Sequence, residues 1–166
     1  FALTARGRAG VELGHGSEDF WQEATFLVLR TIGLEFSELD AYWDEPFEDV
    51  VTGQVINNIR LRVTERLPAA YVVHEAWLQG RPFYVDRNVL IPRSFIAEIL
   101  EERLAPWCAD PEAPLAVIDL CTGSGCLAIL AAQAFPAARV TGSDISEDAL
   151  AVAGVNRAYY GLEDTL

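Results

Sequence analysis

A glycine-bearing turn between a predicted strand and a predicted helix constrains this chain more than any other feature. The apolar run Leu115–Leu120 has the length and composition of a parallel strand buried on both faces. The turn Cys121–Gly125 follows it, and a helical pattern runs from Cys126 to Phe135. A second strand is predicted over Arg139–Ser143, with Asp144 directly after it. This order is typical of the opening of a nucleotide-binding α/β sheet.

Two acidic residues indicate which ligand such a sheet would bind. Asp144 lies 19 residues after Gly125, close to the interval of about 20 at which an acid accepts ribose hydroxyls. Asp119 precedes the first glycine, where its charge would repel a pyrophosphate but suits an ammonium and a sulfonium. The pair favours S-adenosylmethionine. A nicotinamide-dependent oxidoreductase remains the alternative, because residues 123–128 also fit the dinucleotide pattern G-x-G-x-x-A.

Plainer interpretations of the same residues stay open. Gly123 and Gly125 can form a tight turn without a ligand, and Asp144 can act only as a helix cap. We expect Cys121 and Cys126 to be small buried residues with no redox or ligand role. The two histidines have no partner at metal-ligand spacing, so no metal site is predicted.

The first third of the chain is predicted to be helical. A helix begins near Ser17, whose hydroxyl is the expected cap, and its buried stripe would include Leu27. A second helix is predicted from about Phe47 to Leu67 and would be ended by Pro68. Its predicted buried positions are Val51, Val55, Ile56, Ile59, Val63 and Leu67.

Further elements are predicted between this helical region and the glycine turn, and after it. Residues 75–85 read as a β-hairpin around a Gln79-Gly80 turn. Residues 89–94 form a brief extended piece, and a helical pattern then covers 95–104. A last helix should begin near Ser146, with Leu150, Val152 and Val155 as its apolar positions.

The charge and the cysteine content indicate which binding partners and which cellular compartment to expect. The formal net charge is −13, and all 12 basic residues are arginine, which argues against direct nucleic-acid binding and favours a basic protein partner. Seven acids and no base lie between Glu35 and Asp49, so a non-catalytic binding module for a basic protein is a further alternative. Three clustered cysteines fit no disulfide framework, and no apolar run is long enough for a membrane span. These features predict a cytoplasmic protein.

Several motifs together resemble the HemK-like protein-glutamine methyltransferases. They are Phe83-Tyr84-Val85-Asp86, Val89-Leu90-Ile91-Pro92-Arg93-Ser94, Asp119–Cys126, and Ser143-Asp144-Ile145-Ser146, with further likeness at His15-Gly16-Ser17 and Glu65–Tyr71. Pro92-Arg93-Ser94 and Cys121–Cys126 are similar to the branch that modifies ribosomal protein L-three of the large subunit. The release-factor branch, which is the alternative, carries Ile-Pro-Arg-Pro-Glu-Thr where this sequence has Ile91-Pro92-Arg93-Ser94. Phe95 departs from the proline frequent in the ribosomal-protein branch.

The resemblance implies an α/β fold in three parts. A helical substrate-recognition domain (residues 1–75) would be joined by a β-hairpin linker (76–92) to the first part of a class I, Rossmann-like methyltransferase domain (93–166). The activity would be S-adenosylmethionine-dependent methylation of a glutamine side-chain amide in a basic ribosomal protein.

The resemblance also implies roles for individual residues. Asp119 and the turn would hold the methionine part of S-adenosylmethionine, Asp144 the ribose, and Ile145 the adenine. The turn residues are Cys121, Thr122, Gly123, Ser124 and Gly125. Leu90, Pro92 and Arg93 would border the site.

The sequence further predicts that these 166 residues are part of a longer chain. The Asn-Pro-Pro-Tyr motif that holds the substrate amide in the family does not occur here, so no catalytic residue is assigned. Methionine is absent, and two strands would leave a parallel sheet with open edges. We therefore expect the isolated chain neither to methylate a substrate nor to bind S-adenosylmethionine tightly.

Overall fold

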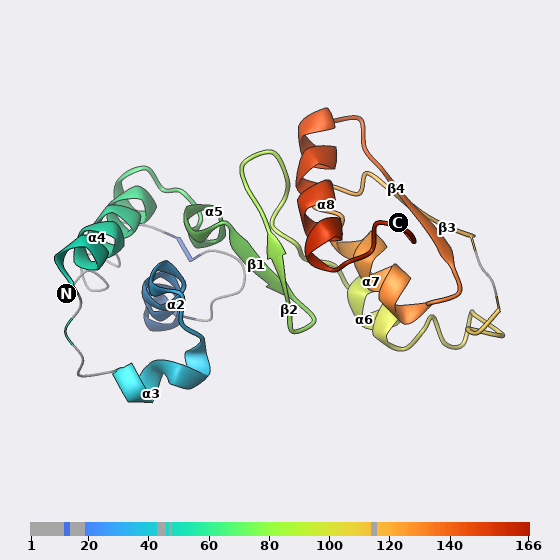
Figure 1. Cartoon of the computed structure of the whole chain (residues 1–166), viewed down its shortest axis with the longest axis horizontal. Helices are drawn as coiled ribbons and strands as arrows, with labels where there is room; N and C mark the ends of the chain where they lie inside the picture. The colour runs from blue at the N-terminus through green and yellow to red at the C-terminus, as the bar shows by residue number, and fades with distance from the viewer. Residues whose placement is uncertain (1–11, 14–18, 43–45, 47, 114–115) are drawn as a thin grey trace. The chain divides into compact units, whose positions relative to one another are not determined.

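The chain divides into two units, residues 1–74 and residues 75–166 (Figure 1). The structure, a computed structural model, describes residues 12–13, 19–42, 46, 48–113 and 116–166. Over these residues it combines helices with two short two-stranded sheets, which confirms the predicted α/β class. No helix within these ranges is long and apolar enough to cross a membrane.

The first unit is helical, as predicted. Helix α2 (Phe20–Ile32) packs against α4 (Asp49–Thr64) and α5 (Ala69–Val73). A short 3-10 turn, η1 (Phe36–Glu38), and helix α3 (Leu39–Tyr42) lie between α2 and α4 in the sequence. Buried Leu27, Ala69 and Val72 form the centre of the apolar core. The predicted acidic stretch thus contains η1, α3 and the start of α4.

Three details of the helical prediction are wrong. The cap of α2 is Asp19, whose carboxylate accepts a hydrogen bond from the Gln22 N–H at 2.7 Å; Ser17 lies outside the described residues. Helix α4 ends at Thr64, before the predicted Leu67, because Arg66 adopts a left-handed conformation, and Pro68 is instead the N-cap of α5, a helix that the sequence did not predict. Ile56, predicted to be buried, is 61% exposed.

An ion pair lies in the interior of the first unit. Arg62 on α4 is 4% exposed and Glu23 on α2 is fully buried, and Arg62 Nε donates to Glu23 Oε1 at 2.6 Å. Arg62 also donates to the Glu12 carbonyl at 2.6 Å. A helix pattern judged by its apolar residues assigns charged residues to the solvent face, so it does not identify Arg62 as the buried residue of α4.

The second unit begins with the predicted hairpin. Strands β1 (Glu75–Leu78) and β2 (Arg81–Tyr84) pair antiparallel, with Glu75 opposite Tyr84 and Leu78 opposite Arg81. Gln79 and Gly80 form the turn in left-handed backbone conformations, with φ of 49° and 66°. Left-handed geometry at both positions matches the twist of the flanking strands, which is why an X-Gly pair predicts such a turn.

The rest of the second unit is built on a parallel strand pair. Strand β3 (Ala116–Leu120) pairs with β4 (Arg139–Ser143) in the register Ala116 opposite Arg139. Helix α7 (Cys126–Ala134) connects them and contacts both, while α6 (Ile96–Glu101) packs on α7 and α8 (Glu147–Tyr159) follows β4. The helix predicted over 95–104 is shorter, since Arg103 and Leu104 adopt left-handed conformations.

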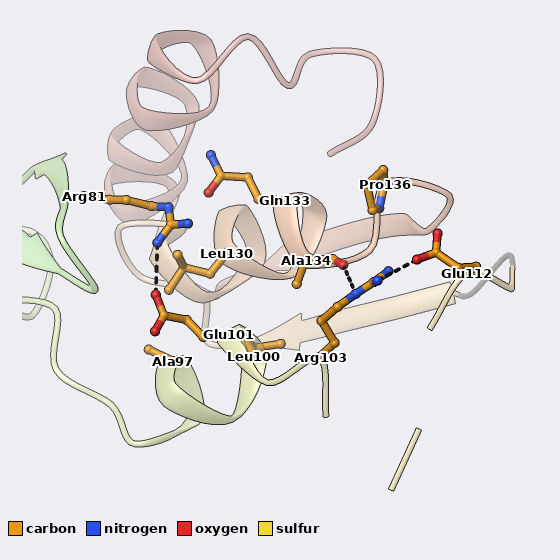
Figure 2. A pocket seen from close by; sticks show the side chains of 10 residues that line it. All are labelled: Arg81, Ala97, Leu100, Glu101, Arg103, Glu112, Leu130, Gln133, Ala134 and Pro136. Atoms are coloured by element: carbon orange, nitrogen blue, oxygen red, sulfur yellow. Dashed lines mark hydrogen bonds and ion pairs between the residues drawn. The ribbon is translucent and has the colours of Figure 1, made fainter. Parts of the chain in front are cut away.

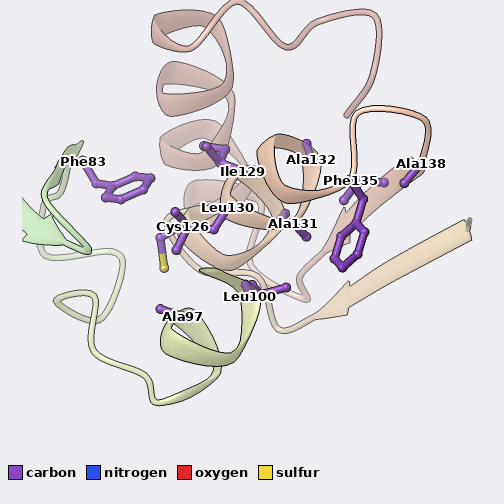
Figure 3. Packing of buried hydrophobic residues seen from close by; sticks show 12 residues of the cluster. Phe83, Ala97, Leu100, Cys126, Ile129, Leu130, Ala131, Ala132, Phe135 and Ala138 are labelled. Atoms are coloured by element: carbon purple, nitrogen blue, oxygen red, sulfur yellow. The ribbon is translucent and has the colours of Figure 1, made fainter. Parts of the chain in front are cut away.

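Alanines and larger apolar residues of α7 form the centre of the second core (Figure 3). Ile129 and Phe135 are at most 1% exposed, and Phe83 reaches the same cluster from the hairpin. The hairpin and the parallel strands therefore share one core within this unit.

The prediction that the first parallel strand is buried on both faces is wrong for the described residues. Burial alternates along β3, and Ile118 and Leu120 are 67% and 73% exposed. Helix α7 contacts the sheet. The outward side chains of β3, among them Ile118 and Leu120, are not covered by any part of the chain that the structure describes. Of the apolar positions named for α8, Val152 is buried, whereas Leu150 and Val155 are exposed.

Candidate functional site

The glycine turn follows β3 in an unusual backbone conformation. Cys121, Gly123 and Gly125 have φ values of 61°, 56° and 79°. Glycine adopts this left-handed region freely, but a cysteine there is strained, and such strain gathers at functional sites. Cys121 is exposed, which corrects the expectation that it is buried, whereas Cys126 is buried as predicted. The turn thus presents its first residue to solvent and ends in the core.

Thr122 anchors the turn to both strands. Its side chain is buried, its hydroxyl donates to Asp119 Oδ2 at 2.6 Å, and its N–H donates to the Ser143 carbonyl at 2.9 Å. This approach requires Gly142, because a Cβ at that position would lie 2.9 Å from Thr122 Oγ1. The hydroxyl occupies one oxygen of Asp119 and orients the carboxylate.

Asp144 links the end of β4 to the glycine turn. Its Oδ2 accepts a hydrogen bond from the Gly123 N–H at 3.0 Å, and its Oδ1 accepts one from the Ser146 N–H at 3.0 Å. The Ser146 and Gly123 amides hold the pKa of Asp144 below its ordinary value. The carboxylate is therefore charged at neutral pH. Ser146 caps α8 through its own hydroxyl, so the interpretation of Asp144 as a cap alone leaves its bond to Gly123 unexplained.

The turn is closed on one side and open on the other. A Cβ at Gly125 would come within 3.1 Å of the Ala153 Cβ, so the end of the turn needs glycine to pack on α8. A Cβ at Gly123 would meet nothing within 4 Å. A ligand can therefore approach the backbone at Gly123 without displacing protein atoms.

Asn156 is a residue of this region that the sequence reading missed. It lies on α8, is 1% exposed, and its Nδ2 donates to the Ser124 carbonyl at 2.8 Å. The signal was available, because Asn156 follows Ala149 and Val152 at the helical spacing of the buried face. A polar residue at such a position is satisfied internally and contacts backbone groups.

The structure joins part of the predicted site by hydrogen bonds. These contacts connect Asp119, Thr122, Gly123 and Asp144. Ile145, next along the chain, has a wholly exposed side chain. Leu90, Pro92 and Arg93 lie in the irregular segment before α6, where Leu90 is exposed and Pro92 is buried.

Burial also distinguishes Cys121 of the turn from Cys126, the first residue of α7. Desolvation is the main cause that raises the pKa of the Cys126 thiol above its ordinary value. Cys126 is therefore an apolar core residue at neutral pH. No group of three or more potential metal ligands occurs in the described ranges.

A cavity of the second unit lies away from this turn. It has a volume of about 620 Å³ and is bordered by α6, α7 and Arg81 of β2 (Figure 2). Two ion pairs flank it, Arg81 with Glu101 at 3.4 Å and Arg103 with Glu112 at 2.5 Å. Arg103 also donates to the Ala134 and Pro111 carbonyls. The charged side chains that line this cavity are thus paired with one another, and the cavity shares no lining residue with the glycine turn.

Comparison with known proteins gives two kinds of match. Residues 98–166 match the family described as Ribosomal protein L11 methyltransferase (PrmA). The whole chain is 52% identical to a Bordetella pertussis protein named ribosomal protein uL3 glutamine methyltransferase, covering 100% of this chain and 56% of that protein. Proteins of the same name from Burkholderia pseudomallei and Neisseria meningitidis serogroup A are 47% and 43% identical, over 99% and 100% of this chain.

These matches agree on the reaction class and differ in the substrate they name. The chain spans about half the length of the curated relatives it matches, since it covers 54% to 56% of the three proteins. The whole-chain matches include the helical unit, whereas the PrmA match begins at residue 98. The whole-chain matches therefore carry more information about this sequence.

Proposed function

We propose that this chain is part of a protein that methylates a glutamine side-chain amide of uL3. It matches proteins named ribosomal protein uL3 glutamine methyltransferase over 99% to 100% of its residues. The observation that carries the proposal is the hydrogen bond between Asp144 and the Gly123 amide. It puts a charged carboxylate beside an open stretch of glycine backbone, as an adenosine-bearing cofactor requires.

The residues of the turn fit S-adenosylmethionine. Asp119 has one oxygen engaged by Thr122, and its other oxygen would accept the ammonium of the cofactor. The exposed backbone of the turn would receive the carboxylate of the methionine part. Asp144 would bind the ribose and Ile145 the adenine.

The bound cofactor would supply a methyl group already activated by its sulfonium. The protein's task in such a transfer is to hold the amide nitrogen in line with the methyl and to stabilise the changing charge. The residues described here would hold the cofactor in that position. No catalytic residue is assigned among them, and Leu90, Pro92 and Arg93 would border the site.

The helical region would contribute substrate recognition. We assign residues 1–75 to that role, 76–92 to the linker and 93–166 to the methyltransferase domain. The sequence from Glu35 to Asp49 contains seven acids and no base, and although Glu35 pairs with Arg30 at 2.6 Å, this stretch suits a basic ribosomal protein. Opposite charge would accelerate encounter, as it does in other protein complexes. The protein would act in the cytoplasm, without direct nucleic-acid binding.

A two-step experiment tests the proposal. First, S-adenosylmethionine is titrated calorimetrically into the whole protein and into its Asp144→Asn variant, with Asp148→Asn as the control for loss of one charge. We expect binding that Asp144→Asn weakens and Asp148→Asn preserves. Second, purified uL3 is incubated with methyl-labelled cofactor, and the modified residue is identified by mass spectrometry.

The outcomes separate the proposal from its alternatives. Label on a uL3 glutamine supports it. Binding of a nicotinamide dinucleotide in place of S-adenosylmethionine would favour an oxidoreductase. Label on L11 and none on uL3 would show that the substrate named by the shorter match is the correct one.

A further inference from the structure

We propose that Asn156 is a positioning residue that couples the backbone of the β-hairpin to the glycine turn, so that the cofactor bound at the turn also orders the hairpin. The inference rests on the proposed function, because it names a positioning residue for the same cofactor site. Asn156 itself would not touch the cofactor.

The first observation is the set of bonds that the Asn156 side chain makes. Its Oδ1 accepts from the Tyr84 N–H at 2.7 Å, and its Nδ2 donates to the Tyr84 carbonyl at 2.9 Å. The same Nδ2 donates its second hydrogen to the Ser124 carbonyl at 2.8 Å. Both amide hydrogens and the amide oxygen are therefore engaged, and every partner is a backbone group.

The second observation is the burial of this junction. Asn156 is 1% exposed and Ser124 is 3% exposed. Water cannot easily replace the amide, so loss of a donor leaves a buried carbonyl without a partner. A junction of this kind transmits a displacement of the Ser124 peptide to Tyr84, since one rigid planar amide holds both.

The third observation concerns what the two linked segments do. Ser124 belongs to the turn that would hold the cofactor, between Gly123 and Gly125. Tyr84 is the last residue of β2, the strand that pairs with β1, and β1 begins directly after the helical unit ends at His74. Asn156 thus joins the cofactor turn to the hairpin that leads along the chain to the proposed substrate-recognition region.

Further contacts hold the hairpin on α8 and supply a reference for the test. The Tyr160 hydroxyl donates to the Pro82 carbonyl at 2.6 Å, and its ring lies 5.5 Å from the ring of Phe83. These contacts do not involve the glycine turn. They should keep the hairpin seated when the Asn156 amide is altered, which allows coupling to be separated from folding.

The test compares wild type with Asn156→Asp in the whole protein, using hydrogen exchange of residues 83–85 with and without saturating S-adenosylmethionine. The aspartate keeps the shape and the acceptor for the Tyr84 N–H but loses both donors. We expect the cofactor to slow exchange at 83–85 in wild type and to have no such effect in the variant. We also expect the variant's Kd for the cofactor to rise about tenfold, the size of a typical coupling between a binding site and a segment linked to it.

Two further variants keep the test decisive. Asn57→Asp, at an exposed position on α4, makes the same change of charge and should retain both wild-type responses. If Asn156→Asp does not fold, Asn156→Ser is used in its place. A serine hydroxyl has a single hydrogen, so it cannot donate to both the Tyr84 and the Ser124 carbonyl. Cofactor-dependent protection that persists in the folded Asn156 variant would overturn the coupling. Absence of S-adenosylmethionine binding by wild type would instead overturn the proposed function and this inference with it.

Discussion

The carboxylate of Asp144 accepts a hydrogen bond from the Gly123 amide at 3.0 Å and so fastens the end of one parallel strand to the turn after the other. The carboxyl ends of parallel strands meet at the same edge of a sheet, which explains why residues 21 positions apart come together. The bond also fixes the orientation of the carboxylate. Preorganisation of this kind lowers the cost of ligand binding.

The lowered pKa of Asp144 predicts a specific pH dependence of stability. A carboxyl whose folded pKa lies below its unfolded value stabilises the fold fully above the unfolded value and loses that contribution as the pH falls through the folded one. We expect the thermal midpoint of wild type to fall more steeply than that of Asp144→Asn below about pH 4. Thermal unfolding at a series of pH values measures this. Parallel curves for the two proteins would contradict it, and Asp148→Asn should follow wild type.

Gly142 and Gly154 form a matched pair for testing the packing of the turn. Gly142→Ala places a methyl group against the buried Thr122 hydroxyl, and we expect a loss of about 1–3 kcal/mol in the free energy of unfolding. Gly154→Ala on α8 meets no atom within 4 Å and should stabilise by about 0.5–1 kcal/mol. Denaturant unfolding checks both, and equal effects would contradict the close approach.

Cys121 of the turn and Cys126 of α7 should differ in their reactivity toward alkylating reagents. Cys121 is exposed, whereas burial limits access to Cys126 and raises its pKa. We expect iodoacetamide to modify Cys121 first in the folded protein and Cys126 only on unfolding, with sites assigned by mass spectrometry. S-adenosylmethionine should slow the reaction of Cys121 in the whole protein. Rapid labelling of Cys126 in the native state would show that the turn opens.

The buried ion pair of the helical unit predicts unequal effects of two arginine substitutions on α4. Arg62→Ala removes the partner of fully buried Glu23, and we expect a loss of about 3–5 kcal/mol in the free energy of unfolding. Arg60 contacts Glu65 at 3.9 Å near the surface, so Arg60→Ala should cost at most about 1 kcal/mol. Chemical denaturation of both variants measures the difference. Similar losses would mean that Arg62 is not the buried partner of Glu23.

Local signals predicted the elements around the turn well. Residues 139–143 form the predicted strand, Ser146 caps the predicted helix, and the Gln79-Gly80 hairpin has the predicted turn. Each of these depends on interactions within a few residues, which the sequence displays directly. The helical unit was predicted less well, because Arg62 and Glu23 bury charge through a contact 39 positions apart.

The sequence by itself determined the α/β order of elements, the glycine turn, and the two acids that flank it, because backbone preference and residue spacing are local properties. Only the tertiary structure decided which groups those acids contact. Thr122 meets Asp119 near the end of β3, Gly123 meets Asp144, and Asn156 meets Tyr84 across 72 positions. The spacing along the chain indicated that Asp144 and the glycine turn serve one site, but the individual hydrogen bonds depend on how strands pair and helices pack.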